Sequence, residues 1–267
     1  MSRIPFEQLP ADVRQAVVDK TGRVHAARTV RGGMNSGIAS VLGTESGNVF
    51  VKGIPADHPQ VDAQRREAAI APHLPASCPR LHWHLELDGW TLLGYEMIDG
   101  RHADYTPGSP DLPLVEAALT ELQQVMAPAD IEIKDAVGRW AEYAPPGTSH
   151  YFGGEALLHT DFAPDNVLIV GDRARVVDWA WPTRGAAWID PGALALRLME
   201  AGHSAEEAVA FVGRFPSWRE AKPEALAAFG VATAALWREI GTGDRTPWKR
   251  ALAKQAATLA RALGRSL

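Results

Sequence analysis

The chain has 267 residues, a formal net charge of −5 and a composition that is 46% hydrophobic and 22% charged. Its length fits one large domain or two coupled lobes, and its composition is that of an ordinary soluble globular protein rather than a disordered chain. The negative charge and the lack of a polybasic run argue against nucleic acid as a partner, since that affinity depends on clustered Lys and Arg.

The sequence predicts neither a membrane-spanning segment nor a disulfide. No apolar run approaches the roughly 20 residues that span a bilayer, and the segment Met1 to Glu7 lacks the pattern of a signal peptide, so we expect a cytoplasmic protein. The single Cys78 cannot form an internal disulfide, and no Cys/His cluster has the spacing of structural zinc. Stability must therefore come from packing.

The first hundred residues predict a small antiparallel sheet. A short amphipathic helix is expected over residues 11 to 20, and a second helix between Pro59 and His73, where Ala, Gln, Arg and Glu are frequent. The Asp88-Gly89 pair predicts a tight hairpin turn. The expected strands are Val24 to Val30, Ile38 to Thr44, Asn48 to Gly53, Leu81 to Leu87 and Trp90 to Met97.

Beyond Gly100 the pattern becomes mainly helical, and Glu96 to Arg101 is the expected boundary between the lobes. Helices are predicted over Leu112 to Val125 and Ile131 to Tyr143, and from Pro191 to the C-terminus. Short buried strands are predicted at Ala156 to Leu158, Val167 to Val170 and Arg175 to Val177.

The most specific pattern runs from His159 to Asn166, with the sequence HTDFAPDN, and is followed by an apolar strand and Asp178. It has the form H-x-D-x-x-x-x-N with a second Asp at the end of a strand. Phosphoryl transfer needs a carboxylate that orients a hydroxyl, and an amide and a second carboxylate that hold Mg²⁺ against triphosphate oxygens. Asp161, Asn166 and Asp178 supply these groups, and a turn at Gly171-Asp172 would return Asp178 to the side of Asn166. Taken singly, such residues more often cap a turn or begin a loop.

This ordered set resembles the aminoglycoside phosphotransferase and choline-kinase-like enzymes, relatives of the protein kinases. The resemblance covers most of the chain and implies an α+β, bilobal protein-kinase-like fold. The N-terminal nucleotide-binding lobe would be a small antiparallel sheet with one key helix, over residues 1 to 98. The C-terminal catalytic and substrate-binding lobe would be mainly helical, over residues 99 to 267.

The resemblance also implies roles for the motif. Asp161 would be the catalytic base or the residue that orients the acceptor hydroxyl, and Asn166 and Asp178 would be the Mg²⁺ ligands. His159 would have a supporting role in tying the loop to its surroundings. Asp190 resembles the acidic residue that braces the catalytic region in these enzymes, and we interpret it as structural.

Such a fold needs a strand lysine for the α- and β-phosphates and a helix glutamate that holds this lysine. Lys52, in the third expected strand, is the candidate lysine, and Glu67, on the following helix, is its expected ion-pair partner. Each has an ordinary alternative as a solvated residue of a strand or a helix.

Two further segments are expected to contact the nucleotide. The glycine-rich segment Arg31 to Gly37 lies between the first two strands, where Asn35 and Ser36 would lead phosphate contact, although a plain hairpin turn is its alternative. Glu96 and Ile98 fall where the family's interlobe hinge offers backbone groups to adenine. Because such recognition uses the backbone, ATP and GTP are not distinguished.

Departures from the protein kinases point to a small acceptor. Ala163 replaces the catalytic-loop lysine, Asp178 opens the sequence DWA in place of DFG, and no APE sequence follows. Thr160 occupies a position that is often glycine in the aminoglycoside-kinase-like branch. Trp179, Trp181 and Trp188 follow the second Asp and form either a substrate wall or, as is more frequent for tryptophan, core.

The acceptor itself is not readable from the sequence. Glu206 and Glu207 would attract a cationic aminoglycoside, but Ser204 to Glu207 also fits a helix capping box. The favoured prediction is an ATP- and Mg²⁺-dependent O-phosphotransferase for an aminoglycoside or a related natural-product antibiotic, with a role in antibiotic resistance. The alternatives are a kinase of another metabolite, such as an amino alcohol or a sugar, and a catalytically silent nucleotide-binding regulatory module. A protein kinase is disfavoured, and the sequence does not indicate the oligomeric state.

Overall fold

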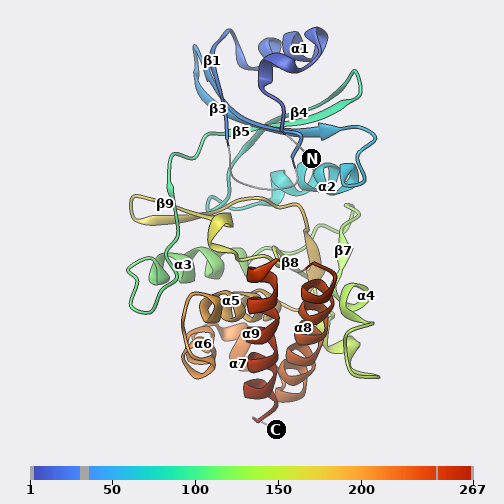
Figure 1. The fold of residues 1–267 in the computed structure, drawn as a ribbon, viewed down its shortest axis with the longest axis vertical. Helices are drawn as coiled ribbons and strands as arrows, with labels where there is room; N and C mark the ends of the chain where they lie inside the picture. The colour runs from blue at the N-terminus through green and yellow to red at the C-terminus, as the bar shows by residue number, and fades with distance from the viewer. Residues whose placement is uncertain (1–2, 31–35, 245, 266–267) are drawn as a thin grey trace. The chain divides into compact units, whose positions relative to one another are not determined.

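The computed structural model describes residues 3–30, 36–244 and 246–265 (Figure 1). The chain forms two compact units, Met1–Gly100 (unit 1) and Arg101–Leu267 (unit 2). Strands and helices occur in both units, and unit 2 holds most of the helices, so the predicted α+β class is confirmed. Within the ranges described, no helix combines the length and apolar content that a membrane crossing requires.

Unit 1 is a five-stranded antiparallel sheet with helices packed against it. The sheet has the strand order β1-β2-β3-β5-β4. Its strands are β1 (Val24–Thr29), β2 (Ile38–Thr44), β3 (Gly47–Pro55), β4 (Leu81–Leu87) and β5 (Trp90–Glu96). Its helical segments are η1 (Phe6–Gln8), α1 (Ala11–Thr21), α2 (Val61–Ile70) and η2 (Ala71–His73). The predicted sheet and its two helices are thus present.

The two faces of this sheet have separate cores, because successive residues of a strand point to opposite sides. Val51 and Leu92 pack with Val13 and Val17 of α1. Phe50 and its neighbours instead pack with Ala68 of α2, Leu93 and Tyr95. Lys52 lies two residues beyond Phe50 and therefore belongs to the α2 face.

The β4–β5 hairpin turns at Asp88-Gly89, as the sequence predicts. Both residues have positive φ angles, 46° and 73°. This backbone matches the right-handed twist of the adjoining strands, and it is adopted readily by glycine and tolerated by Asp.

Unit 2 contains two small sheets and most of the helices. The sheets have the orders β10-β9-β6 and β7-β11-β8. The strands are β6 (Arg101–His102), β7 (Lys134–Asp135), β8 (Ala156–Leu158), β9 (Val167–Val170), β10 (Arg173–Val176) and β11 (Thr183–Gly185). The helical segments are α3 (Leu112–Leu122), α4 (Ala136–Trp140), η3 (Ser149–Phe152), η4 (Pro164–Asn166), α5 (Ile189–Glu200), α6 (Ala205–Val212), α7 (Pro216–Glu220), α8 (Pro223–Gly243) and α9 (Pro247–Gly264).

Helices α8 and α9 form an antiparallel pair and lie side by side in Figure 1. Their close approach depends on Gly230 of α8, where a Cβ atom would lie only 2.9 Å from the Cα atom of Ala260. Larger side chains at this point would force the helices apart, since cores are packed too tightly to absorb them.

The predicted helix over Ile131 to Tyr143 is wrong. Lys134 and Asp135 instead form β7, which pairs in parallel with β11, and α4 extends only over Ala136–Trp140. The side chain of Asp135 accepts a hydrogen bond from the backbone N of Gly138 at 2.9 Å and so caps α4. Asp is a favoured N-cap, and the strand pairing fixes an extended backbone just before it.

Candidate functional site

Unit 1 holds a buried ion pair between Lys52 of β3 and Glu67 of α2. The Nζ atom of Lys52 lies 2.7 Å from Oε2 of Glu67, with side chains that are 12% and 5% exposed. The other carboxylate oxygen, Oε1, accepts a hydrogen bond from the hydroxyl of Tyr95 at 2.9 Å. Glu67 is thus held at both oxygens, and the ion pair that the sequence predicts is formed. Its role in nucleotide binding stays a prediction.

Three other predicted nucleotide residues of unit 1, Ser36, Glu96 and Ile98, lie near the ends of strands. Ser36 precedes β2 and is half-buried, whereas Asn35 lies outside the described residues. Glu96 ends β5, and its backbone N donates to the carbonyl of Arg80 at 2.9 Å. Ile98 follows in irregular chain and is half-buried.

In unit 2 the loop before η4 is fixed by Asp190, which lies in the first turn of α5. The backbone N–H groups of His159 and Thr160 donate to its two carboxylate oxygens at 2.9 and 2.8 Å. The side chain is buried, and this burial raises the pKa of Asp190 above its ordinary value, while the two backbone donors and the charge of Arg139 oppose the shift. Asp190 therefore braces the loop, which agrees with the structural role interpreted from the sequence.

Thr160 has a left-handed backbone with a φ of 69°. Glycine adopts this conformation without a steric penalty, whereas a β-branched residue is strained by roughly 1–3 kcal/mol. The bond from its N–H to Asp190 holds this backbone in place, and its hydroxyl accepts a hydrogen bond from Arg139 at 2.7 Å. The tertiary contacts thus offset the strain of threonine at this position.

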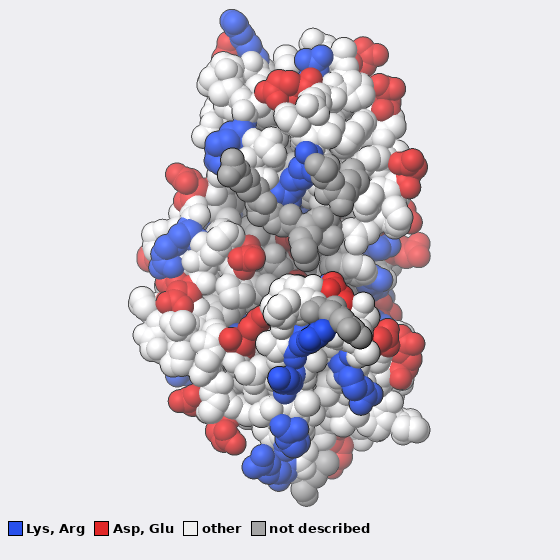
Figure 2. Space-filling view, viewed as in Figure 1, with Lys and Arg blue, Asp and Glu red and all other residues white. Residues whose placement is uncertain are grey.

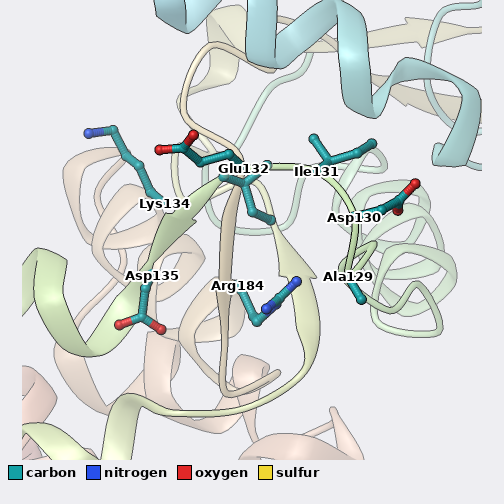
Figure 3. Close-up of a pocket in the computed structure, with 8 residues that line it drawn as sticks. Ala129, Asp130, Ile131, Glu132, Lys134, Asp135 and Arg184 are labelled. Carbon is teal, nitrogen blue, oxygen red and sulfur yellow. The ribbon is translucent and has the colours of Figure 1, made fainter.

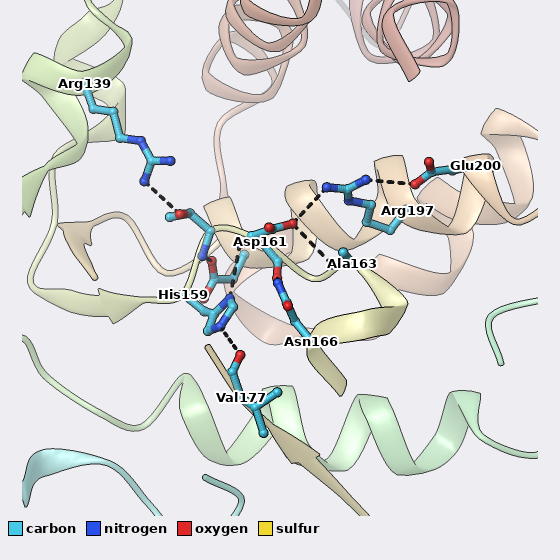
Figure 4. A network of polar contacts seen from close by, with 10 residues as sticks. Arg139, His159, Asp161, Ala163, Asn166, Val177, Arg197 and Glu200 are labelled. Atoms are coloured by element: carbon cyan, nitrogen blue, oxygen red, sulfur yellow. Dashed lines mark hydrogen bonds and ion pairs between the residues drawn. The ribbon is translucent and has the colours of Figure 1, made fainter. Parts of the chain in front are cut away.

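His159 is buried and has contacts at both ring nitrogens (Figure 4). Its Nε2 lies 3.0 Å from the carbonyl oxygen of Val177, and its Nδ1 accepts the backbone N–H of Asp161 at 3.2 Å. The tautomer with its proton on Nε2 satisfies both contacts. His159 therefore ties the loop to the end of the β9–β10 hairpin and does not point a free nitrogen at a reactant.

Asp161 is partly exposed, with 44% of its side chain accessible. Its Oδ1 accepts hydrogen bonds from Nη2 of Arg197 at 2.8 Å and from the backbone N of Ala163 at 3.3 Å (Figure 4). Oδ2 stays available to a hydroxyl group of a ligand. The arrangement orients one carboxylate oxygen and presents the other.

Arg197, on α5, is a site residue that the sequence analysis misses. Its side chain is 11% exposed and also binds Oε2 of Glu200 at 2.9 Å. Burial opposes the positive charge, but Asp161 and Glu200 outweigh burial and raise the pKa of Arg197 above its ordinary value. It is separated from Asp161 by 36 residues, so no local pattern indicates the contact.

Asn166 and Asp178 flank the open end of the β9–β10 hairpin. Val167 pairs with Val176, and the backbone N of Val177 donates to the carbonyl of Asn166 at 2.9 Å. The side-chain N of Asn166 donates to the carbonyl of Asp161 at 3.1 Å, which leaves its amide oxygen as the ligand atom. An amide oxygen and a carboxylate are the hard donors that Mg²⁺ prefers, so these residues fit that ion.

Asp178 also has a left-handed backbone, with a φ of 65°. Strained residues of this kind collect at functional sites, where the surrounding structure holds them in place. Among the described residues, no group of three or more His, Cys, Asp or Glu side chains could hold a metal ion. A Mg²⁺ ion bound by Asn166 and Asp178 would therefore complete its coordination with oxygens that do not come from such side chains.

Arg139 of α4 is a second residue that sequence reasoning misses. Its Nη1 donates to the hydroxyls of Thr160 and Thr183 at 2.7 and 2.8 Å, and its guanidinium lies 4.8 Å from the ring centroid of Trp140. Burial lowers the pKa of Arg139 to about 10. Arg139 thus links the motif loop to β11 and places a positive charge in a mostly buried environment.

The three tryptophans after Asp178 have different environments. Trp179 is buried and packs edge-on against His159 at 4.8 Å, and Trp188 is buried against Phe152 and Phe229. Both belong to the core, in agreement with the more frequent role of tryptophan. Trp181 is 36% exposed.

The surface of unit 2 also has a hollow (Figure 3). It is lined by residues 129 to 135 and by Arg184, whose Nη2 donates to the carbonyl of Pro128 at 2.8 Å. Its lining mixes acidic and basic side chains and does not include Asp161, Asn166 or Asp178. The hollow is therefore separate from the predicted set of site residues.

Comparisons with known proteins support the fold. No family model and no curated protein matches the chain. Among solved structures, a thermostable mutant of aminoglycoside phosphotransferase APH(4)-Ia, in a ternary complex with ADP and hygromycin B, matches with 14% identity and a TM-score of 0.60, over 94% of this chain and 99% of that chain. The choline kinase LicA from Streptococcus pneumoniae matches with 11% identity and a TM-score of 0.64, over 94% of this chain and 98% of that chain.

The chain has the fold of these kinases. The likeness extends over nearly the whole length of each, so the predicted bilobal kinase-like fold is confirmed. Identities of 11–14% establish the fold and leave the reaction and the acceptor to be argued from the residues.

Proposed function

We propose that this chain transfers the γ-phosphoryl group of ATP to a hydroxyl group of a small molecule, with Mg²⁺ as its metal ion. The observation that carries this proposal is the presentation of Asp161 next to Asn166. One carboxylate oxygen of the partly exposed Asp161 is held by Arg197, the other accepts no hydrogen bond from the described residues, and the Asn166 amide donates to the backbone of Asp161. Phosphoryl transfer depends mainly on positioning and electrostatics, and this arrangement supplies positioning.

In the proposed reaction, an acceptor hydroxyl donates a hydrogen bond to Asp161, which aligns its oxygen with the γ-phosphorus. The new O–P bond forms as the bond between the γ-phosphorus and the bridging oxygen to the β-phosphate breaks, giving ADP and a phosphate ester. The hydroxyl proton passes to Asp161 and then to solvent. Asn166 and Asp178 would hold Mg²⁺, which neutralises phosphate charge when bound.

The two units would divide the work. We propose that residues 1 to 98 bind the nucleotide, through Lys52 kept in place by Glu67 and through the segment that includes Asn35 and Ser36. Glu96 and Ile98 would offer backbone groups to the base, so that GTP is an alternative donor. Residues 99 to 267 would carry Asp161, the metal ligands and the acceptor site. We expect the enzyme in the cytoplasm, where ATP is abundant.

The acceptor class proposed first is an aminoglycoside or a related natural-product antibiotic, for which the activity would confer resistance. The solved neighbours with this fold include a complex with hygromycin B and a choline kinase. Amino alcohols and sugars are the second class.

The proposal is tested by measuring ADP release from Mg-ATP with hygromycin B, other hydroxylated antibiotics, choline and simple sugars as acceptors. Acceptor-dependent release that Asp161→Asn reduces to a small residual rate, while binding of the nucleotide persists, would support it. Asp178→Asn should weaken binding of Mg-nucleotide instead. Nucleotide binding without release on any acceptor would favour a silent regulatory module, and a wild-type rate for Asp161→Asn would exclude the mechanism.

A further inference from the structure

Two packed tryptophans extend from the ion pair between Arg197 and Asp161, the proposed catalytic carboxylate. The guanidinium of Arg197, which binds Asp161, lies 5.5 Å from the ring centroid of Trp237 on α8. The Trp237 ring packs edge-on against Trp248 of α9, with centroids 6.2 Å apart and planes at 65°. Trp248 is 40% exposed, so the pair presents aromatic surface that is linked to Asp161 through Arg197.

A buried hydroxyl with no partner lies in the same region. The side chain of Tyr105 is 1% exposed, and within the part of the chain that the structure describes its Oη has no hydrogen-bond partner. Burial raises the pKa of Tyr105 above its ordinary value, and the charges of Arg197 and Asp161 both act on it, in opposite directions. Buried polar groups are normally paired, so this unused donor favours an ordered water there.

The charges around the tryptophans do not suit a polycation. Helix α9 (Pro247–Gly264) carries Lys249, Arg250, Lys254 and Arg261 and no acidic residue. Figure 2 shows basic side chains gathered on the part of unit 2 where α9 lies in Figure 1. The Nζ atom of Lys249 lies 5.4 Å from the ring centroid of Trp248.

Three carboxylates of this part of unit 2 already have basic or backbone partners. Asp244 forms an ion pair with Lys249, and Glu200 forms one with Arg197. Glu207, which the sequence suggests as a contact for a cationic acceptor, belongs to a complete capping box with Ser204. These three carboxylates are therefore committed to structure rather than to a positively charged ligand.

We infer that Trp237 and Trp248 form the acceptor platform and that the acceptor is a hydroxylated compound with a flat, preferably aromatic, ring and no more than one positive charge. The inference rests on the proposed function, keeps its phosphoryl transfer to a hydroxyl group, and replaces the aminoglycosides proposed first with ring-bearing acceptors of low charge. A ring would stack on the exposed face of Trp248 while its hydroxyl reaches Asp161. Polycationic aminoglycosides would be poor acceptors, because α9 carries basic and no acidic side chains and because Glu200 and Asp244 are already paired.

The test compares acceptors in matched pairs at saturating Mg-ATP, with ADP release as the readout. One pair is 4-nitrophenyl β-D-glucopyranoside and methyl β-D-glucopyranoside, a second is an aromatic and an aliphatic amino alcohol, and hygromycin B represents the polycations. Each is measured with the wild type, Trp248→Ala, Trp248→Phe and Val231→Ala. Val231 is 45% exposed on α8 and serves as the control for an apolar surface truncation.

The ring-bearing member of a pair should have a KM about tenfold lower than its partner, since an aromatic contact of this kind is worth about 1.4 kcal/mol at most. Trp248→Ala should remove that advantage, Trp248→Phe should retain most of it, and Val231→Ala should have no effect. The KM for ATP should be the same in all four proteins.

Two other results are distinguishable from this one. If hygromycin B turns over faster than every ring-bearing compound, and its KM is the same in Trp248→Ala as in the wild type, the two tryptophans are not the acceptor platform. The proposed kinase activity would still hold. ADP release with none of the compounds contradicts the proposed function and removes the basis of the inference as well.

Discussion

Arg197 Nη2 lies 2.8 Å from Oδ1 of Asp161, and the same guanidinium binds Glu200 from the other side. A mostly buried arginine on α5 thus fixes the carboxylate that would orient the acceptor hydroxyl. Replacement by methionine should lower kcat roughly 100-fold, because small misplacements of a reacting group have effects of this size. KM for ATP should stay within about twofold, since Arg197 acts through Asp161 and not on the nucleotide.

A double variant separates positioning from general damage to the fold. Arg197→Met combined with Asp161→Asn should be no slower than Asp161→Asn alone, because both changes remove one interaction. Arg197→Lys should recover part of the rate, and losses that simply multiply in the double variant would argue that Arg197 acts independently of Asp161.

The Lys52–Glu67 pair makes a separate prediction for nucleotide binding. Lys52→Met should weaken the affinity for Mg-ATP by roughly tenfold to a hundredfold, as expected for a lost hydrogen bond between charged groups. Glu67→Gln should have a smaller effect in the same direction, because the lysine stays but loses its ion pair. Isothermal titration with a non-hydrolysable ATP analogue measures both.

Tyr95→Phe is the matched control for this pair, since it removes the hydroxyl that donates to Oε1 of Glu67 and keeps the ring. It should cost about 1 kcal/mol of stability and little affinity. Equal affinities for Lys52→Met and the wild type would remove Lys52 from the nucleotide site.

The parts of the fold that the sequence predicts are those set by local patterns. Strand alternation and the Asp88-Gly89 turn identify the sheet of unit 1, and the H-x-D-x-x-x-x-N motif has contacts within itself, such as Asn166 to the backbone of Asp161. Strands β6 and β7 have two residues each, which is too few for the alternation of a strand to appear in the sequence. Each pairs with a strand that is distant along the chain.

The same distinction applies to the candidate site. Glu67 is predictable because the fold requires a glutamate on that helix, whereas Tyr95, which binds it, has no such signal. Arg139 and Arg197 reach the motif loop from helices that are 21 and 36 residues away from their partners. Such contacts follow from tertiary packing, and single-sequence patterns do not contain them.

Asp190 is predicted to be a major source of stability for the motif loop. Asp190→Ala leaves the buried N–H groups of His159 and Thr160 without acceptors, at about 1–3 kcal/mol each, and it removes the countercharge near Arg139. We therefore expect the free energy of unfolding to fall by about 2–5 kcal/mol. Urea denaturation measures this value.

Asp190→Asn keeps one acceptor oxygen and should lose less than Asp190→Ala. Glu206→Ala, at an exposed position of α6, should leave stability within about 0.5 kcal/mol of the wild type. A stability for Asp190→Ala that matches the Glu206→Ala control would show that the loop is held by other contacts.

Asp111 gives the protein a predictable response to acid. Its buried carboxylate accepts hydrogen bonds from both terminal nitrogens of Arg101, at 2.5 and 2.6 Å, and from the backbone N of Asp104. The bonds from Arg101 hold the pKa of Asp111 below its ordinary value. For a carboxylate with a lowered folded-state pKa, the stabilisation is complete above the unfolded pKa of about 3.9 and is lost as pH falls through the folded value.

Asp111→Asn should therefore destabilise the protein by about 2–4 kcal/mol above pH 5, since it leaves the contacts of a buried carboxylate incomplete. The difference from the wild type should shrink as the pH falls from about 4 toward 2. Urea denaturation at a series of pH values measures it, with Glu121→Gln on the exposed side of α3 as the control. A difference that stays constant over this range would mean that the ionised form of Asp111 is not what Arg101 stabilises.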